Sequence, residues 1–535
     1  MNMLKSSSKA AFTMIFLASL LHVLNASAQI FQPSKVDHAL EIIKYYYVDT
    51  VNDKKLMEEA VRSVIKELDP HSVYIPLEEL REMNEPLVGK FEGIGIQFNI
   101  HEDTIMVTAT IPGGPSEKLG IKAGDRIVNI NDTNVAGVKI TNNDVLKKLR
   151  GDKGTKVRVD IFRKGSAKLL TYVITRDQIP LFSVDASYMV EPGIGYIKIS
   201  RFADATVDEF RKALASLKSQ GMESLVLDLQ GNGGGYLNRA VELSDEFLTA
   251  GKKIVFTRGR SNPDEDFMSS NQGGWEKGKL AILIDQYSAS ASEIVSGAVQ
   301  DWDRGLIIGR RSFGKGLVQK PFQLPDGSLI RLTVAHYYTP SGRNIQRHYE
   351  LGKEDEYAKD FSERSARGEW FHEDSIQYSD TTKYFTNAKR VVRGGGGIMP
   401  DIFVPIDTSL YSDYYSNLLR SGVMNEFPLT YVDNNRNELK SSYGNVEAFK
   451  NAFVIDDKIM NDFLNVAEKM GAKMDSAGYQ ISEPFIKLQL KALIARNLWD
   501  TNAFYVIIND NNMPLRKAVD AIRGKTFEKM KLAGN

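Results

Sequence analysis

The spacing of apolar residues changes several times along the chain, and each change marks a different kind of element. In the N-terminal part, apolar side chains recur every three or four residues, as at Leu56, Ala60 and Val64, which is the period of an amphipathic helix. Pro70 interrupts this pattern, as expected where helices end. We therefore predict a helical N-terminal module over residues 29–88. His71, in the turn after Asp69-Pro70, is interpreted as a structural rather than a catalytic histidine.

Short segments of alternating apolar and polar residues follow, separated by turn signals such as PGGP and KAGD and by one helical stretch, NNDVLKKLRG. This pattern predicts a small, mostly β unit over residues 89–177. Near its start lie Gly93, Ile94, Gly95 and Ile96. Glycines leave backbone N–H groups free to hold a carboxylate, and the adjacent strand edge can pair with an extended peptide. The alternative is a glycine-bearing turn without a ligand.

From about residue 183, wholly apolar strands such as SLVLDL and LAILID alternate with amphipathic helical stretches, which indicates an α/β core over residues 178–408. The helices are expected near residues 208–218, 239–248 and 293–302. Residues 409–535 are more polar and helical, and they carry no motif to which chemistry can be attached. We predict a separate, mainly helical C-terminal domain there.

Composition narrows the classes of function. The chain has 535 residues, and its 68 basic residues balance its 68 acidic ones, so nothing favours a nucleic acid partner. The absence of cysteine excludes disulfides, thiolate catalysis and cysteine zinc sites. None of the seven histidines forms a close pair at metal-ligand spacing. We expect neither a metal nor a cofactor. The oligomeric state stays open, with the N-terminal module and the tail as candidate contacts in a homo-oligomer.

The N-terminus has the features of an export signal. Lys5 and Lys9 precede an apolar run, and the small residues Ala26, Ser27 and Ala28 follow it. We expect cleavage after Ala28 and a periplasmic or extracellular location. The alternative is an uncleaved signal that keeps the protein associated with the membrane.

The strongest candidate for chemistry is the segment DQYSASASEIV, which joins a buried strand to an amphipathic helix. Its serines, Ser288, Ser290 and Ser292, lie where a helix begins, and unpaired N–H groups there favour an oxyanion. Ser290 and Glu293 also form the S-x-x-E pattern of a capping box, so this segment alone leaves both interpretations open.

A nucleophilic serine needs a group that accepts its proton, and histidines 336, 348 and 372 lie in no catalytic pattern. Lys315 lies between two glycines at the start of an apolar strand, where burial would lower its pKa and make it a neutral base. Gln319, four residues further on, lies on the same face and can orient the amine. The alternative is an ordinary surface lysine in a glycine turn.

These motifs resemble known families. The segment GIKAGDRIVNIN and the Gly93–Ile96 stretch resemble a PDZ domain. SASASEI and SFGKGLVQ resemble the C-terminal processing peptidases, tail-specific serine proteases whose motifs occur here in the family's order over residues 35–405. The resemblance implies Ser290 as nucleophile, Lys315 as general base and Gln319 as its orienting residue. It also implies that the N–H groups of Gly234 and Ala291 form the oxyanion hole.

The resemblance implies a multidomain α+β fold: a helical N-terminal module, a PDZ domain, an α/β protease core of the ββα, crotonase-like type, and a helical C-terminal domain. This sequence departs from the family pattern at Gln230, where arginine is usual, and at Val392-Arg393, where Val-Tyr is usual. Neither departure involves the three expected catalytic residues.

We therefore expect an exported serine endopeptidase that recognises polypeptide C-termini through its PDZ domain and processes or degrades precursor or misfolded proteins. The alternative is a peptide-binding PDZ scaffold in which Ser290 only caps a helix. A third interpretation, a Ser-His hydrolase, lacks a suitably placed histidine.

Overall fold

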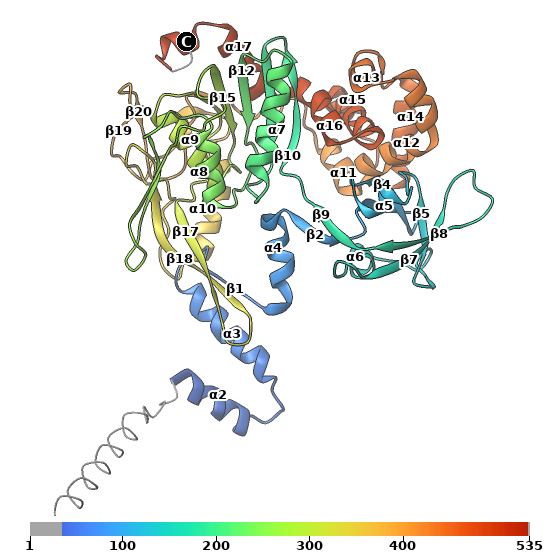
Figure 1. Ribbon diagram of the computed structural model, residues 1–535, viewed down its shortest axis with the longest axis horizontal. Helices are drawn as coiled ribbons and strands as arrows, with labels where there is room; N and C mark the ends of the chain where they lie inside the picture. The colour runs from blue at the N-terminus through green and yellow to red at the C-terminus, as the bar shows by residue number, and fades with distance from the viewer. Residues whose placement is uncertain (1–34, 533–535) are drawn as a thin grey trace, which may run out of the picture. The chain divides into compact units, whose positions relative to one another are not determined.

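The computed structural model describes residues 35–532, so the signal sequence expected at residues 1–28 lies outside the described residues. The chain divides between Leu68 and Asp69 into two compact units. The first unit contains two helices, α2 (Lys35–Tyr46) and α3 (Asp53–Lys66), as the apolar spacing predicts (Figure 1). The Asn52 side chain caps α3 by accepting the N–H of Lys55 at 3.0 Å.

Residues 69–88 do not belong with these helices, although the sequence analysis groups them there. They are part of the second unit, because β1 (Val73–Ile75) pairs with β18 (Leu329–Tyr338) in a sheet of that unit. This segment also contains the one-turn helix η1 (Leu77–Glu79) and α4 (Leu80–Val88). A pairing between residues some 250 positions apart leaves no trace in local periodicity.

The small β unit forms as its alternating segments predict. Its sheet has the order β3-β4-β5-β7-β8, with β6 paired to β5. The strands are β3 (Ile96–His101), β4 (Thr104–Thr110), β5 (Arg126–Ile130), β6 (Thr133–Asn134), β7 (Lys156–Phe162) and β8 (Leu170–Thr175). Two helices, α5 (Pro115–Lys118) and α6 (Asn142–Leu149), complete it, and β2 (Lys90–Gly93) pairs with β9 (Asp177–Pro180) where the chain enters and leaves. Strand β3 lies at an edge of the sheet.

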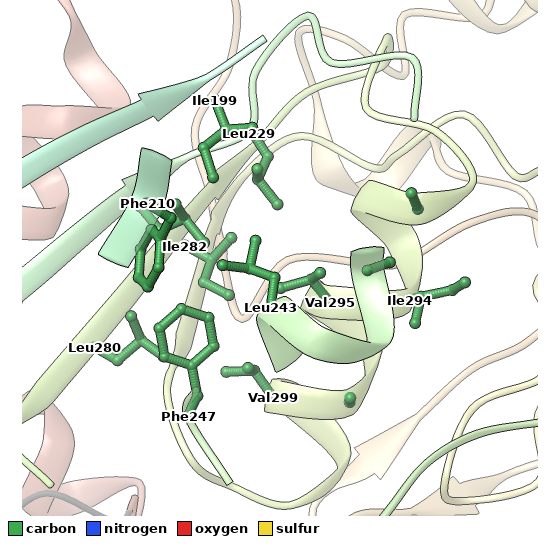
Figure 2. Close-up of a cluster of buried hydrophobic side chains, with 14 of the residues drawn as sticks. Ile199, Phe210, Leu229, Leu243, Phe247, Leu280, Ile282, Ile294, Val295 and Val299 are labelled. Atoms are coloured by element: carbon green, nitrogen blue, oxygen red, sulfur yellow. The ribbon is translucent and has the colours of Figure 1, made fainter. Parts of the chain in front are cut away.

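The α/β core is built on a second sheet with the order β10-β11-β12-β15-β16-β21, parallel from β11 onward. Its strands are β10 (Val184–Glu191), β11 (Ile194–Ile199), β12 (Ser224–Asp228), β15 (Lys279–Ile284), β16 (Leu306–Gly309) and β21 (Ile402–Phe403). Helices α7 (Thr206–Ser219), α8 (Leu237–Asp245) and α9 (Ala291–Asp301) cover one face. Figure 2 shows Leu243 of α8 and Val295 and Val299 of α9 among the side chains Leu280 and Ile282 of β15.

Strand β13 departs from the α/β pattern suggested by its apolar sequence. It pairs antiparallel with β18 in a sheet that also contains β1, β14 and β17, and not with the parallel strands. The elements of this region are β13 (Lys253–Arg258), β14 (Glu265–Met268), β17 (Leu317–Gln323), α10 (Glu354–Ala366), η2 (Glu373–Ser375), β19 (Tyr384–Phe385) and β20 (Val391–Val392). The hairpin between β17 and β18 turns at Asp326-Gly327, as predicted.

The C-terminal region is helical, as expected, but only part of it has a hydrophobic core of its own. That part comprises α11 (Asp413–Ser421), α12 (Val423–Ser442), α13 (Val446–Ala452), α14 (Asp457–Lys469), α15 (Ser476–Leu498) and α16 (Thr501–Ile508). After the short turn η3 (Asn509–Asn511), α17 (Met513–Arg523) and α18 (Thr526–Lys529) pack against the second face of the parallel sheet. The end of the chain is thus a layer of the α/β core, which explains why strands such as LAILID are apolar on both faces.

Candidate active site

The three serines after β15 have different environments. Ser288 and Ser292 are fully buried, and their hydroxyl groups donate to the backbone carbonyls of Leu229 (2.8 Å) and Asn232 (2.9 Å). Ser290 is partly exposed, and although its side chain stands in the capping-box position toward the Glu293 N–H, that N–H donates to the Ser290 carbonyl at 2.9 Å. The flanking serines therefore hold the turn to the loop that follows β12, and Ser290 is the one whose hydroxyl is not committed to that loop.

Ser290 lies in a strained backbone conformation, with φ 53° and ψ −109°. A non-glycine residue in this region costs about 1–3 kcal/mol, and such strain gathers at functional turns between a strand and a helix. In the capping box, the Glu293 side chain accepts a hydrogen bond from the backbone at the start of the helix: the Ser290 N–H donates to Glu293 Oε2 at 2.7 Å. The Glu293 N–H donates to the Ser290 carbonyl at 2.9 Å, so the helix start is satisfied by backbone and carboxylate.

Glu293 has a larger role than the capping pattern suggests. Its carboxylate is fully buried and accepts four hydrogen bonds. Besides the Ser290 N–H, it accepts the Ser312 hydroxyl (2.5 Å) and the backbone N–H groups of Gly314 (2.7 Å) and Lys315 (2.9 Å). Burial raises the pKa of Glu293, and these hydrogen bonds oppose that rise. A single carboxylate thus joins the turn that carries Ser290 to the loop that carries Lys315.

Lys315 and Gln319 lie together, as their spacing suggests. Lys315 Nζ donates to Gln319 Oε1 at 2.9 Å. Burial is the main cause that lowers the pKa of Lys315 below 10.5, and the positive charge of Arg331 adds to it. The charges of Asp69 and Glu293 act in the opposite direction. The amine is therefore more easily deprotonated than that of an exposed lysine.

Ser290 and Lys315 are linked through their backbones. The Tyr337 hydroxyl lies within hydrogen-bonding distance of the carbonyl groups of both Ser290 (3.1 Å) and Lys315. Among the hydrogen bonds of the described residues, none joins the Ser290 hydroxyl to Lys315 Nζ. Catalytic hydrogen bonds often tighten only when substrate binds.

The expected oxyanion donors differ in availability. Gly234 lies against the nucleophile, because a Cβ placed on it would be 2.9 Å from Ser290 Cβ and 3.1 Å from Ala291 N. Its N–H, however, donates to Asn232 Oδ1 at 2.9 Å, so the expectation that it is free to face an oxyanion is not met. An asparagine side chain readily accepts the N–H two residues further on, and this local bond is invisible in the motif. None of the hydrogen bonds found among residues 35–532 engages the N–H of Ala291, at the start of α9.

In the small β unit, Gly93 ends β2, Ile94 and Gly95 form the turn, and Ile96 begins the edge strand β3. The Ile94 carbonyl accepts the N–H (3.2 Å) and hydroxyl (2.6 Å) of Ser116, which fixes the turn. Gly95 has φ 74°, and a Cβ there would lie 3.0 Å from the Ile179 side chain. The turn therefore requires glycine at this position. It precedes a strand whose outer edge has no partner strand in the described chain.

Gln230 stands where arginine is usual, and the cation beside it is Lys198. The buried amine of Lys198 binds Asp228 Oδ1 at 3.1 Å and also donates to the Gln230 carbonyl. The Gln230 side chain accepts a long hydrogen bond, 3.4 Å, from Asn512 in the C-terminal region. A lysine on the adjacent strand β11 thus supplies positive charge at the base of the glycine loop. Sequence comparison at one position does not reveal it.

His71 contacts the site through its backbone, a feature that the sequence analysis missed. Its carbonyl accepts a hydrogen bond from Gln319 Nε2, while its ring Nε2 lies 2.9 Å from the Tyr357 hydroxyl. Burial, followed by the charge of Lys315, lowers the pKa of His71 to about 4, so the ring is neutral near pH 7. The proximity of the LDPHS and GKGLVQ motifs is decided by the pairing of β1, β18 and β17.

Within residues 35–532, no three His, Asp or Glu side chains converge in a way that could hold a metal ion. In the same part of the chain, no helix combines the length and hydropathy needed to cross a bilayer.

Family models match four parts of the chain. Peptidase family S41 matches residues 193–355, and a PDZ domain matches residues 106–163. The activating protease CtpB N-terminal domain matches residues 18–78. Residues 414–500, in the C-terminal helical region, match a family of unknown function, DUF8443.

Curated relatives agree with these models. The chain is 37% identical over 320 residues to the carboxy-terminal-processing protease of Bartonella bacilliformis, which covers 59% of this chain and 73% of the relative. It is 37% identical over 316 residues to the carboxy-terminal processing protease CtpB of Bacillus subtilis, covering 58% and 65%. The chain also matches a solved structure, the photosystem II D1 C-terminal processing protease, at 24% sequence identity. The match covers 69% of this chain and 92% of the other, with a TM-score of 0.35. On the strength of the sequence relatives, the chain belongs to the carboxy-terminal processing proteases, serine-type peptidases of family S41 that carry a PDZ domain.

Proposed function

We propose that this protein is an exported serine endopeptidase that recognises polypeptide C-termini and cleaves through a Ser290–Lys315 dyad supported by Gln319. The observation that carries the proposal is the environment of Lys315. Its amine is buried, has a lowered pKa and is hydrogen-bonded to Gln319. Its backbone is held by the same carboxylate, Glu293, that holds the Ser290 turn.

In the proposed reaction, neutral Lys315 accepts the proton of the Ser290 hydroxyl as Oγ attacks the scissile carbonyl carbon. The Ala291 N–H stabilises the oxyanion of the tetrahedral intermediate, and Gly234 N–H joins it when its bond to Asn232 opens. Protonated Lys315 then gives its proton to the leaving amine, which yields an acyl-enzyme. A water molecule, deprotonated by Lys315, then attacks the ester carbonyl; as the bond to Ser290 Oγ breaks, Lys315 returns the proton to Oγ and the carboxylate product leaves.

Substrate recognition is assigned to the PDZ domain. The turn from Gly93 to Ile96 would hold a terminal carboxylate, and the free edge of β3 would pair with the preceding residues of the substrate. The names of the relatives, carboxy-terminal processing proteases, support this choice of substrate end. Precursor or misfolded proteins with small or apolar C-termini are the proposed substrates. The pattern at residues 1–28 supports export.

The dyad is tested with purified protein and labelled casein as an unstructured substrate. We expect Ser290→Ala and Lys315→Ala to abolish cleavage while leaving the melting temperature close to that of the wild type or above it. Lys320→Ala is the matched control and should cleave normally, because Lys320 is an exposed lysine that contacts Asn262 and lies on β17, the strand that begins just after Lys315. Undiminished cleavage by Ser290→Ala would sink the proposed dyad, whereas absence of cleavage by the wild type would favour a peptide-binding scaffold.

Recognition of C-termini is tested separately in the Ser290→Ala variant, which binds without cleaving. A fluorescent peptide that ends in Ala-Ala with a free carboxylate should bind, as measured by anisotropy, and its C-terminal amide should not. Equal binding of both peptides would contradict recognition of the carboxylate.

A further inference from the structure

The turn at residues 69–72 is tightly built. The buried carboxylate of Asp69 accepts the backbone N–H groups of His71 (2.9 Å) and Ser72 (3.0 Å) and the Ser72 hydroxyl (2.6 Å). Thr333 of β18 ties the turn to the sheet, because its N–H donates to Ser72 Oγ and its hydroxyl to Asp69 Oδ1, both at 3.0 Å. These hydrogen bonds tie the turn to the sheet and set the direction of the His71 carbonyl.

The His71 carbonyl decides how the Gln319 amide is oriented. A carbonyl oxygen only accepts hydrogen bonds, so the side of the amide that faces it must be the NH₂ group, Nε2. Oε1 consequently faces Lys315 and accepts an N–H from Nζ at 2.9 Å. The orientation therefore follows from the chemistry of the neighbours.

This orientation matters for a lysine that acts as a base. A neutral amine has two N–H donors and one lone pair. When Gln319 Oε1 accepts an N–H, the lone pair of Lys315 stays available for the Ser290 proton. If the amide were reversed, its NH₂ group would donate to that lone pair and compete with Ser290.

The His71 ring gives the turn a second contact, with α10. The His71 ring contacts the Tyr357 hydroxyl at 2.9 Å and packs edge-on against the Tyr357 ring, with centroids 5.2 Å apart. Tyr357 belongs to α10 and is itself buried. The turn is thus held from β18 and from α10, and its His71 carbonyl binds the Gln319 amide.

We propose that the Asp69–Ser72 turn is a positioning element of the active site, in which the His71 carbonyl selects the Gln319 orientation that keeps the Lys315 lone pair free. The inference rests on the proposed Ser290–Lys315 dyad. It assigns His71 a positioning role through its backbone, and its ring takes no part in proton transfer.

The test is a double-mutant cycle between Ser72→Ala and Gln319→Ala, with cleavage of labelled casein as the readout. Ser72→Ala removes the hydroxyl that bonds Asp69 and Thr333, so the carbonyl loses its fixed direction. We expect a loss of roughly 10- to 100-fold in kcat with intact Gln319, since small displacements of a catalytic group have effects of this size. In the Gln319→Ala background the same substitution should have almost no further effect.

Ser328→Ala is the matched control. Ser328 is also buried and donates its hydroxyl to an aspartate two residues earlier, Asp326 (2.6 Å), but at the far end of β18. It should retain normal kcat in both backgrounds. Ser72→Thr, which restores a hydroxyl, should recover most of the lost activity.

If Gln319→Ala turns over too slowly to measure, the rate at which a fluorophosphonate labels Ser290, read by intact-protein mass spectrometry, replaces kcat. An equal loss from Ser72→Ala in both backgrounds, or no loss in either, would overturn the inference. These results leave the dyad standing, provided that Ser290→Ala is inactive. Cleavage by Ser290→Ala would instead refute the proposed function itself.

Discussion

The carboxylate of Glu293 accepts the backbone N–H of Ser290 at 2.7 Å, and the Glu293 N–H in turn donates to the Ser290 carbonyl at 2.9 Å. The S-x-x-E pattern therefore serves two purposes at once. The glutamate satisfies the helix start, and the serine keeps its hydroxyl for chemistry. A nucleophile and a capping box are compatible because the hydrogen bonds between Ser290 and Glu293 run through the Ser290 backbone N–H and carbonyl.

Replacing Glu293 by glutamine should disturb both the fold and the site. The amide NH₂ group cannot accept hydrogen bonds, so at least two of the four donors around Glu293 lose their partner in a fully buried position. We expect Glu293→Gln to lower the free energy of unfolding by about 1–3 kcal/mol, measured by denaturant titration. Cleavage should fall by more than tenfold, because the Ser290 turn and the Lys315 loop lose their shared acceptor.

Glu356→Gln is the control for this substitution, since Glu356 is an exposed glutamate of α10 whose contact is with Lys353. This substitution should change neither the free energy of unfolding nor the rate of cleavage. Full activity of Glu293→Gln would show that the shared carboxylate is not needed for the alignment of the site.

The lowered pKa of Lys315 makes a prediction about pH. Activity should rise with pH along a limb whose midpoint lies below 10.5, because the base must be neutral. A limb with a midpoint near 6.5 that persists in Lys315→Ala would point to a histidine and contradict the assignment. Initial rates between pH 5 and 10 provide the measurement.

The same pKa predicts a stability change. Folded Lys315 binds its proton less tightly than in the unfolded chain, so between the folded pKa and 10.5 the unfolded chain holds more protons and stability rises with pH. At lower pH the folded protein carries a buried, poorly compensated charge. Lys315→Met should therefore be inactive and more stable than the wild type by about 1 kcal/mol at pH 7. The difference in free energy of unfolding, measured by denaturant titration, should shrink as the pH approaches 10.5. A Lys315→Met variant less stable than the wild type at pH 7 would refute the prediction.

Gly234 is expected to tolerate no side chain. An alanine Cβ would lie 2.9 Å from both the Ala289 carbonyl oxygen and Ser290 Cβ, in a backbone conformation with φ 101°. Gly234→Ala should displace Ser290 and reduce cleavage by about 100-fold. Gly231→Ala is the comparison, because Gly231 also has positive φ (70°) but open space around its Cα. It should keep most of the activity, and similar losses in both variants would attribute the effect to backbone strain alone.

The last helices should be essential to the stability of the protease core. Phe527 of α18 is fully buried against the second face of the parallel sheet. Phe527→Ala should lower the free energy of unfolding by about 3–5 kcal/mol. The activity per folded molecule should stay near normal, since no catalytic residue contacts this face. Phe385→Ala, at an exposed phenylalanine of β19, should have little effect in the same denaturation experiment. A negligible effect of Phe527→Ala would mean that the tail is dispensable.

Much of the local structure follows from the sequence. The apolar run of β15 and the helical spacing after Ser290 predict a strand followed by a helix, because side-chain burial repeats with period 2 in strands and 3.6 in helices. Lys315 and Gln319 lie four residues apart, so their proximity is also local. The motifs indicate the family without any structure.

Other features of the site were decided only by the tertiary structure, mainly through contacts between segments that are distant in sequence. Which serine hydroxyl is available depends on Leu229 and Asn232, which engage Ser288 and Ser292. The commitment of the Gly234 N–H to Asn232, although local, depends on the conformation of the loop and not on its composition. The contact of His71 with Gln319 depends on the antiparallel alignment of β1, β18 and β17. Local spacing determines whether each segment forms a helix or a strand. Only the packed chain determines which donors bond to which acceptors, because most of those partners are far apart in sequence.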